Sequence, residues 1–323
     1  MNDASIPRNR SQARANELPG ATSLCLSIAG LCLHYRGAER IRVAAPTQCY
    51  STFLRASPAD GPCIDTVEME VVDGEVPRPD LLTSVFNTGH TWSLLSDERR
   101  HVFQLNLALK SAKPPWSITV DRGFNHGRIY CNEKMITPSG KSRLAHNVIE
   151  NPLDEILITH VGLARSASML LHAAGGSIDG RGVIFAGPAG TGKSTVSRLL
   201  GKARKTHFLS DDRIVVRRFG SKLKMFGTPW PGDAGVGVNE SVTVKALCFL
   251  RPGNTTELTP LDATTARDRL LPVAFVPWYM PSLAERANEL CDFLVARYPA
   301  FDLSFRPDAG ELESVLGNFS RAA

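Results

Sequence analysis

A glycine-rich segment, Gly187–Ser194, constrains this chain more than any other part of its sequence. Its residues read GPAGTGKS and fit the pattern G-x-x-x-x-G-K-[ST] at every fixed position. The apolar run Gly182–Ala186 before it predicts a strand, and the amphipathic stretch after it predicts a helix. Because a loop in this context cradles phosphate groups, the segment predicts a nucleotide-binding α/β fold.

Each residue type in this loop has a physical role in holding phosphates. Glycines let successive backbone N–H groups turn toward phosphate oxygens, and the positive end of the following helix adds to the attraction. We expect Lys193 to neutralise β- and γ-phosphate oxygens and the Ser194 hydroxyl to bind Mg²⁺. The expected nucleotide-binding residues are Gly187, Pro188, Ala189, Gly190, Thr191, Gly192, Lys193, Ser194 and Thr195.

A pair of carboxylates and a histidine flank the loop in the sequence. Asp211 and Asp212 follow the predicted strand His207–Ser210. Adjacent residues of an extended chain point to opposite sides, so one carboxylate can face a metal while the other faces an acceptor group. His172 lies in a predicted strand before the loop, and an imidazole beside a carboxylate can orient it and share its proton. Taken singly, the histidine is more typical of a core residue, and the acidic pair is more typical of a turn.

Three segments occur in a fixed order along the chain: Leu171–Ala174, Gly182–Thr195 and Phe208–Val216. Together they resemble the catalytic core of the HPr serine kinase/phosphorylase family, which shares its nucleotide fold with ATP-dependent phosphoenolpyruvate carboxykinases. The similarity covers about residues 150–250, including the helix that begins with Asn151–Glu155. The resemblance therefore implies a phosphate-loop domain of this type.

The resemblance also implies an activity and a set of roles. It implies a kinase that uses ATP and Mg²⁺ to phosphorylate a hydroxyl, foremost a serine of a protein or peptide. Asp212 would accept the proton of the acceptor hydroxyl, with His172 positioned near it. Lys193 would bind the transferred phosphoryl group, and Ser194 and Asp211 would lie at the metal.

The sequence departs from the family pattern at three places. Ala189 stands where the family usually has serine. The metal-binding glutamate of the family has no clear counterpart, and Asp233 and Glu240 are its candidate replacements. The basic loop that grips HPr is not evident. The acceptor is therefore left open between a protein or peptide and a free serine-like metabolite, and a nucleotide-binding regulatory module without transfer activity is a third hypothesis.

Two tryptophans are considered beside the site. Trp230 lies in the Gly- and Pro-rich stretch Gly227–Gly237, which is typical of a loop near a nucleotide or acceptor. It is expected either to stack on an adenine or to anchor this loop on the core, and the sequence leaves both open. Trp278 is expected to be structural.

The chain is predicted to have three parts. Residues 1–20 read as a flexible arm, and residues 21–148 as a smaller mixed or β-rich domain of unknown role, with strands in Leu24–Leu33, Thr66–Val72, Trp116–Val120 and Gly127–Cys131. Residues 149–323 read as the α/β phosphate-loop domain, with helices starting after Pro152, near Ser282 and after Asp308.

Composition limits the classes of partner. The 37 Lys and Arg against 32 Asp and Glu give a net charge of only +5, and the basic residues are scattered, so no nucleic-acid partner is expected. No apolar run approaches the ~20 residues of a membrane span, and no secretory signal is recognisable, so a cytoplasmic protein without a membrane partner is expected. The 7 cysteines contain no CxxC pair and are expected to be reduced thiols without zinc. A homo-oligomer is left open.

Overall fold

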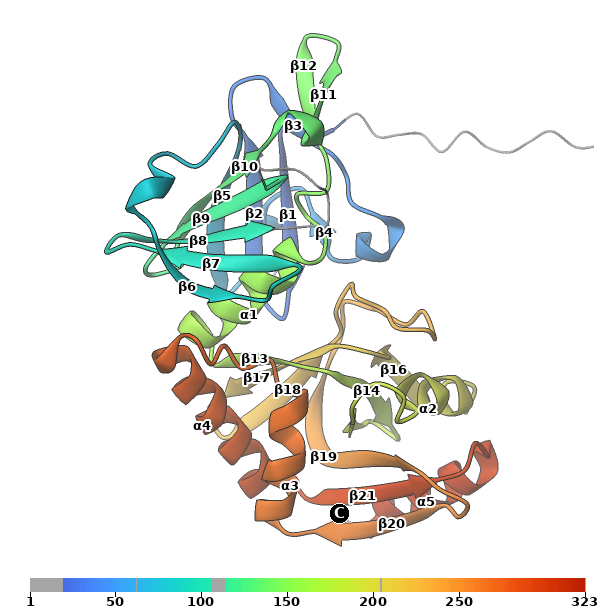
Figure 1. The fold of residues 1–323 in the computed structure, drawn as a ribbon. Coiled ribbons are helices and arrows are strands. Elements are labelled where there is room, and N and C mark those ends of the chain that lie inside the picture. Colours follow the sequence, from blue (N-terminus) through green and yellow to red (C-terminus); the bar gives the residue numbers. More distant parts are fainter. Residues whose placement is uncertain (1–19, 62, 106–113, 204, 323) are drawn as a thin grey trace, which may run out of the picture.

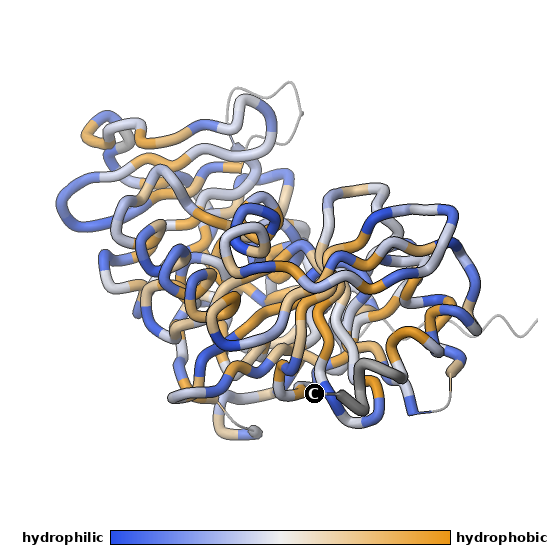
Figure 2. Tube along the Cα trace, turned by 90° about the horizontal axis from the view of Figure 1, so that it is seen from below, coloured by the Kyte–Doolittle hydropathy of each residue, from blue (hydrophilic) through white to orange (hydrophobic). Residues whose placement is uncertain are grey.

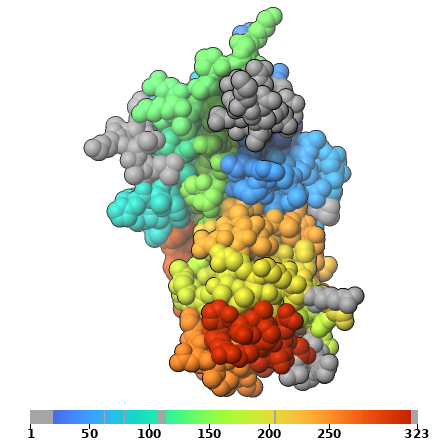
Figure 3. All heavy atoms as spheres, turned by 90° about the vertical axis from the view of Figure 1, so that its right-hand side faces the viewer, coloured from blue at the N-terminus to red at the C-terminus, as the bar shows by residue number. Residues whose placement is uncertain are grey.

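The computed structural model describes residues 20–61, 63–105, 114–203 and 205–322. Residues 1–19 of the predicted arm lie outside these ranges. The described chain is an α/β structure with two large mixed sheets, one built from its N-terminal half and one from its C-terminal half (Figure 1). The two halves are stacked one above the other (Figure 3).

The N-terminal half consists mainly of strands. Its large sheet has the order β4-β1-β2-β5-β10-β9-β8-β7-β6, and a small sheet beside it has the order β11-β12-β3. In the large sheet, β5 pairs in parallel with both β2 and β10. The strands are β1 (Ser23–Ile28), β2 (Leu31–Gly37), β3 (Ile41–Val43), β4 (Leu54–Arg55), β5 (Asp65–Asp73), β6 (Thr83–Asn87), β7 (Trp92–Ser96), β8 (Arg100–Leu105), β9 (Trp116–Asp121), β10 (His126–Cys131), β11 (Ile136–Ser139) and β12 (Ser142–Ala145).

The apolar run Leu24–Leu33 is a hairpin and not one strand. β1 and β2 pair antiparallel through a turn at Ala29 and Gly30, whose φ angles are 55° and 77°. Both sides of these strands are covered, so the run does not alternate between apolar and polar residues and its sequence does not indicate the turn. The other three predicted strands of this half are confirmed as β5, β9 and β10.

The expectation of reduced thiols is wrong for one pair of cysteines. Cys32 on β2 and Cys63, just before β5, form a disulfide. The buried thiol of Cys25 lies beside it, and the three sulfur atoms lie within 4.8 Å of one another. The pairing of strands β1, β2 and β5 brings these residues together from distant positions in the chain, so no short sequence motif predicts the disulfide.

The disulfide should stabilise the N-terminal sheet. It links residues 31 positions apart, and closing a loop of that size lowers the entropy of the unfolded chain by an amount equivalent to about 3–4 kcal/mol. We expect Cys63→Ser to lower the free energy of unfolding by about this amount, measured by guanidinium denaturation without reductant. Cys49→Ser, at an exposed free thiol, should leave it unchanged. Equal stability of the two variants would contradict the prediction.

The C-terminal sheet is also mixed, and β19 lies at its centre. Its path is β13-β17-β18-β19-β15-β14-β16, and β21 pairs with both β19 and β20. β15 and β21 are parallel to β19. The strands are β13 (Ser168–Leu171), β14 (Ala173–Ile178), β15 (Arg181–Ala186), β16 (Thr206–Ser210), β17 (Ile214–Phe219), β18 (Lys222–Phe226), β19 (Ser241–Pro252), β20 (Glu257–Leu261) and β21 (Ala300–Phe305).

His172 marks a break between two strands. The sequence predicts one strand over Met169–Ala174, but β13 pairs with β17, whereas β14 forms a hairpin with β15. The sequence allows a hairpin between this predicted strand and Gly182–Ala186, and the observed hairpin pairs Ala173–Ile178 with β15. His172 lies between the two pairings, and its backbone N–H donates to the carbonyl of Val273 at 2.7 Å. The backbone therefore changes its pairing partners at His172, which belongs to neither strand.

Five α-helices occur in the described residues: α1 (Leu153–Arg165), α2 (Lys193–Leu200), α3 (Ala263–Leu270), α4 (Pro281–Arg297) and α5 (Ala309–Ala322). α1 lies between the two sheets (Figure 1). The predicted starts of α1, α4 and α5 are confirmed, whereas α3 was not predicted. Buried apolar side chains from both sheets and from α1 form one continuous core, and Figure 2 shows apolar segments running through the interior.

Polar contacts join the two halves beside this core. Arg217 on β17 is 4% exposed and donates to the carbonyl of Ala29 at 2.9 Å and to Asp65 at 3.2 Å. Asn239 donates to the carbonyl of Thr52 at 3.0 Å. These contacts fix the turn of the first hairpin and the start of β5 against the C-terminal sheet. The expected division of the chain at residues 148 and 149 stays a prediction.

Within the part of the chain described above, no helix combines the length and the apolar character needed to cross a membrane.

Candidate functional site

The glycine-rich segment forms a tight loop between the end of β15 and the start of α2. Gly190 and Gly192 have φ angles of +83° and +98°, a region that residues with a side chain rarely adopt. A Cβ atom at Gly192 would also lie 2.6 Å from the ring of Phe305. Gly192 is followed directly by α2, so the loop ends at the positive end of a helix.

Lys193 lies against the loop that precedes it. Its side-chain nitrogen donates to the carbonyl oxygens of Gly187 at 2.9 Å and Pro188 at 3.1 Å. Burial lowers the pKa of Lys193, although the negative charges of Asp212 and Asp211 oppose this. The buried ammonium group of Lys193 is thus bound to the loop by two carbonyl groups, and an anion could take their place as hydrogen-bond acceptor.

Asp212 and His172 form a pair that faces the same space as the loop. Nε2 of His172 lies 3.0 Å from one oxygen of Asp212, and Nη1 of Arg213 lies 3.2 Å from the other. Burial alone would raise the pKa of Asp212, but the hydrogen bond from His172 and the charge of Arg213 outweigh it, so this pKa is lowered. The carboxylate is therefore ionised at neutral pH, where it can accept a hydrogen bond or a proton.

Asp211 has a different environment from its neighbour. Its carboxylate is fully buried and accepts backbone N–H groups from Gly232 at 2.9 Å, Ala234 at 2.7 Å and Val236 at 3.1 Å. Both oxygens are occupied by this loop, and the residue does not line the cavity beside the glycine-rich loop. The expectation that Asp211 lies at the metal does not agree with this arrangement, because its side chain organises the Gly227–Gly237 loop instead.

The glycine-rich loop, His172 and Asp212 surround one cavity of about 370 Å³. Asp233 and Arg198 complete its wall, and Arg198 on α2 donates to the backbone carbonyl of Asp233 at 2.9 Å. No sequence motif includes Arg198, although it lies one helical turn after Ser194, a spacing that places both residues on the same side of α2. Of the residues expected at the site, the cavity is lined by His172, Ala189, Gly190, Gly192, Lys193, Ser194, Thr195 and Asp212.

The two candidates for the missing glutamate are separated by the fold. Asp233 is exposed at the wall of the cavity. Glu240 pairs with His207 at 3.1 Å and does not line the cavity. Asp233 is thus the carboxylate that stands near Ser194, and a hydroxyl with a carboxylate is a donor set that suits Mg²⁺.

A second carboxylate approaches the site from α1. Glu155 lies 3.4 Å from Nε of Arg213, so one guanidinium group bridges Glu155 and Asp212. Burial raises the pKa of Glu155, and the positive charge of Arg213 opposes the rise. The sequence indicated Glu155 only as part of a helix start. Its approach to Arg213 depends on how α1 packs against the C-terminal sheet.

Trp230 anchors its loop and does not cover a nucleotide. Its indole is 4% exposed, and Nε1 donates to Asp154 at 2.9 Å and to the hydroxyl of Tyr50 at 3.1 Å. Tyr50 belongs to the N-terminal half, Asp154 to α1 and Trp230 to the loop that Asp211 organises. Of the two hypotheses for Trp230, stacking on an adenine is therefore wrong.

The carboxyl group of Asp154 should make stability depend on pH. It is fully buried, which raises its pKa to about 7 from 3.8. The folded protein then holds a proton that the unfolded chain releases, so this group's contribution to stability falls as pH rises from about 4 to about 7. Asn at this position mimics the protonated acid. We expect the unfolding free energy of Asp154→Asn minus that of wild type to be about 2–3 kcal/mol larger at pH 8 than at pH 5.

The measurement is urea denaturation of both proteins at the two pH values. Taking the difference between the proteins removes the contributions of other groups, including His101 and His160, whose pKa values burial lowers to about 4. A difference that does not change with pH would show that Asp154 is ionised in the folded protein throughout.

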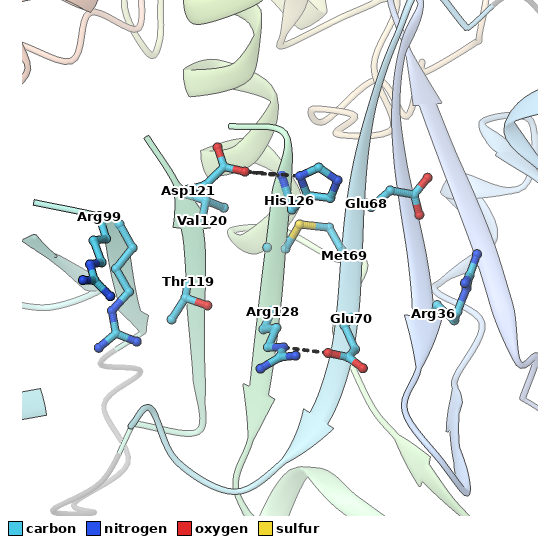
Figure 4. Close-up of a pocket in the computed structure, with 12 residues that line it drawn as sticks. Arg36, Glu68, Met69, Glu70, Arg99, Thr119, Val120, Asp121, His126 and Arg128 are labelled. Atoms are coloured by element: carbon cyan, nitrogen blue, oxygen red, sulfur yellow. Dashed lines mark hydrogen bonds and ion pairs between the residues drawn. The ribbon is translucent and has the colours of Figure 1, made fainter. Parts of the chain in front are cut away.

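Another hollow, of about 430 Å³, lies on the outer face of the N-terminal sheet (Figure 4). Four of its charged side chains form two pairs with one another, and Glu68 and Arg100 pair with His34 and Asp97 outside the hollow. Arg128 pairs with Glu70 at 2.6 Å, and Asp121 lies 3.4 Å from His126. Charges of both signs alternate along this face, so it resembles a solvated sheet surface and not a site for one charged ligand.

The family model described as SynChlorMet cassette protein ScmC matches residues 148–288, which is less than half of the chain. The matched part contains the glycine-rich loop, His172 and Asp212. No curated protein matches the chain. Among solved structures, the HPr(Ser) kinase/phosphatase from Coxiella burnetii is similar at 16% identity, over 47% of this chain and 96% of that chain, with a TM-score of 0.29. A TM-score this low does not by itself establish a shared fold.

Proposed function

We propose that this protein transfers the γ-phosphoryl group of ATP to a hydroxyl group, foremost a serine of a protein or peptide, with Mg²⁺ as cofactor. One observation carries the proposal. The ionised carboxylate of Asp212, held by His172, faces the same cavity of about 370 Å³ as Lys193 and Ser194 of the glycine-rich loop. A proton acceptor and a phosphate-binding loop thus share one space, as phosphoryl transfer requires.

The loop and the first turn of α2 would hold the phosphates. Backbone N–H groups of the loop and the N-terminus of α2 attract phosphate oxygens. The ammonium group of Lys193 would exchange its two carbonyl partners for oxygens of the β- and γ-phosphates. Ser194 and Asp233 would hold Mg²⁺, which supplies neutralisation of phosphate charge when bound.

Asp212 would activate the acceptor. The carboxylate accepts the proton of the acceptor hydroxyl while the hydroxyl oxygen forms a bond to the γ-phosphorus, and the bond between that phosphorus and the bridging oxygen of ADP breaks. His172 would act as a positioning residue, because its hydrogen bond fixes one oxygen of Asp212. Arg213 holds the other oxygen and keeps the carboxylate ionised at neutral pH.

Two substitutions separate transfer from nucleotide binding. We expect Asp212→Asn to reduce phosphoryl transfer by about 10²–10⁴-fold with unchanged ATP affinity, because it removes the proton acceptor alone. Lys193→Ala should weaken ATP binding and transfer together. The assay uses γ-labelled ATP and Mg²⁺ with serine-containing peptides, free serine and a lysate of the host, and follows the label.

Asp179→Asn provides the control, since this carboxylate lies in the exposed β14–β15 turn. Label only in small molecules would favour the metabolite kinase. Full activity of Asp212→Asn would contradict the proposed role of this residue, and nucleotide binding by the wild type without transfer to any acceptor would favour a regulatory module.

The role of Asp233 at the metal has its own test. We expect Asp233→Asn to raise the Mg²⁺ concentration needed for half-maximal transfer by about tenfold, the effect of losing one interaction worth about 1.4 kcal/mol. Glu240→Gln is the matched control, because Glu240 faces His207 outside the cavity. If both variants need the same Mg²⁺ concentration as wild type, Asp233 is not at the metal.

A further inference from the structure

A cavity of about 250 Å³ lies beside the candidate site, between the two halves of the chain. We call it the aromatic pocket and define it by Phe86, Trp92, Glu155, His160, Phe275 and Tyr279. Phe86 comes from the edge strand β6 of the N-terminal sheet and Trp92 from its neighbour β7, and Glu155 and His160 come from α1. The pocket is thus built by both halves of the chain together.

The walls of this pocket are aromatic rings that support one another. The ring of Phe86 stacks on that of Tyr279 at a centroid distance of 4.2 Å, and Trp92 lies 5.3 Å from Phe86 and 5.7 Å from Tyr279. All three rings are only partly buried. Such a set of ring faces and edges can take up one more ring in a stacked or edge-on arrangement.

The histidine in the wall adds no positive charge. Nδ1 of His160 donates to the carbonyl of Ile156 at 2.6 Å, and its Nε2 accepts from the hydroxyl of Tyr279 at 3.0 Å. Burial lowers the pKa of His160 to about 4, so the ring is neutral at neutral pH. Glu155, the one acidic residue of the lining, is engaged by Arg213, and beside Thr88 and Thr159 the rest of the lining is aromatic or aliphatic.

The pocket is joined to the proton acceptor of the site. Glu155 lines it, and only the guanidinium group of Arg213 separates Glu155 from Asp212. The opposite wall, which contains Phe275, lies near His172, because the N–H of Phe275 donates to the carbonyl of Leu170 at 3.0 Å. The pocket therefore adjoins the end of the phosphate cavity where His172 and Asp212 stand.

This position excludes the base of the nucleotide as the natural occupant. Asp212 is where the acceptor hydroxyl would meet the γ-phosphoryl group, and the nucleoside lies at the other end of the phosphates. A group in the aromatic pocket belongs to the acceptor.

We propose that the aromatic pocket binds an aromatic side chain of the acceptor peptide, a few residues from the serine that is phosphorylated. This inference rests on the proposed function and specifies its substrate class. The volume is below the ~300–1,000 Å³ of sites that enclose whole small ligands, so it suits a single side chain. The carboxylates of Glu155 and Asp212 contact the same guanidinium group at 3.4 Å and 3.2 Å, so they lie within about 9 Å of each other. An extended peptide advances about 3.3–3.6 Å per residue and spans such a distance in about three residues, which places the aromatic residue within about three positions of the serine.

The surface next to the pocket supports a peptide as the occupant. Trp278 lies between Pro277 and Tyr279, both of which line the pocket, and its side chain is 62% exposed. It is the most exposed of the large hydrophobic side chains in the described ranges. An exposed indole at this place extends the apolar surface past the pocket, as a contact for neighbouring residues of a bound peptide requires.

The test uses blocked alanine peptides with one central serine and one phenylalanine, placed in turn at each of the three positions on either side. The Kd of each peptide for the full protein is measured by calorimetry in the presence of Mg²⁺ and a non-hydrolysable ATP analogue. We expect at least one phenylalanine peptide to bind about tenfold more tightly than the all-alanine parent. Equal Kd values for all peptides on the wild-type protein would overturn the proposal.

Two variants locate the effect. Phe86→Ala should remove the preference for phenylalanine and leave the affinity for the ATP analogue unchanged, which also shows that the variant is folded. Val85→Ala is the matched control, because Val85 is the neighbouring residue of β6, is 42% exposed and does not line the pocket. A preference that survives Phe86→Ala, or a loss of affinity for the ATP analogue instead, would place the aromatic side chain elsewhere and overturn the proposal.

Transfer from γ-labelled ATP to the same peptides separates this inference from the proposed function. Selective binding without transfer supports the pocket and counts against the kinase reaction. Equal transfer to all peptides, with equal Kd values, supports the kinase and overturns the pocket.

Discussion

The buried carboxyl group of Asp154 is the contact on which the arrangement of the candidate site depends. It accepts the indole N–H of Trp230 and bonds with the hydroxyl of Tyr50, so it joins α1, the Gly227–Gly237 loop and the N-terminal half. Burial of an acid is costly unless it is hydrogen-bonded or neutral, and here it is both hydrogen-bonded and shifted toward the neutral form. Its neighbour Glu155 contacts Arg213 at the site, so the first turn of α1 supplies one carboxyl group to the core and one to the candidate site.

Asp211 and Asp212, the acidic pair after β16, also have different environments. The carboxylate of Asp211 accepts three backbone N–H groups and so shapes the Gly227–Gly237 loop, which brings Asp233 to the cavity. Asp212 points to His172 and Arg213. β16 ends at Ser210, and the bend at Asp211 and Asp212 turns the first side chain to the Gly227–Gly237 loop and the second to His172 and the cavity.

The site is shared between the halves of the chain. The cavity beside Lys193 and Asp212 is lined by residues of the C-terminal half alone, whereas the aromatic pocket needs β6 and β7 of the N-terminal sheet. Arg213 connects them, because it bonds to Asp212 and to Glu155 on α1. In the proposed function, the strand-rich N-terminal half would help to build the surface that an acceptor meets.

The sequence by itself determined the features that depend on neighbours along the chain. The glycine-rich loop between a strand and a helix, the β14–β15 hairpin and the starts of α1, α4 and α5 follow from local spacing and local conformational preferences. Only the tertiary structure decided that Asp211 holds a loop, that Trp230 is an anchor, that Cys32 bonds to Cys63 and that Glu155 reaches Arg213. Each of these joins residues far apart in the chain, and such contacts are set by how the sheets and α1 pack, which no local pattern records.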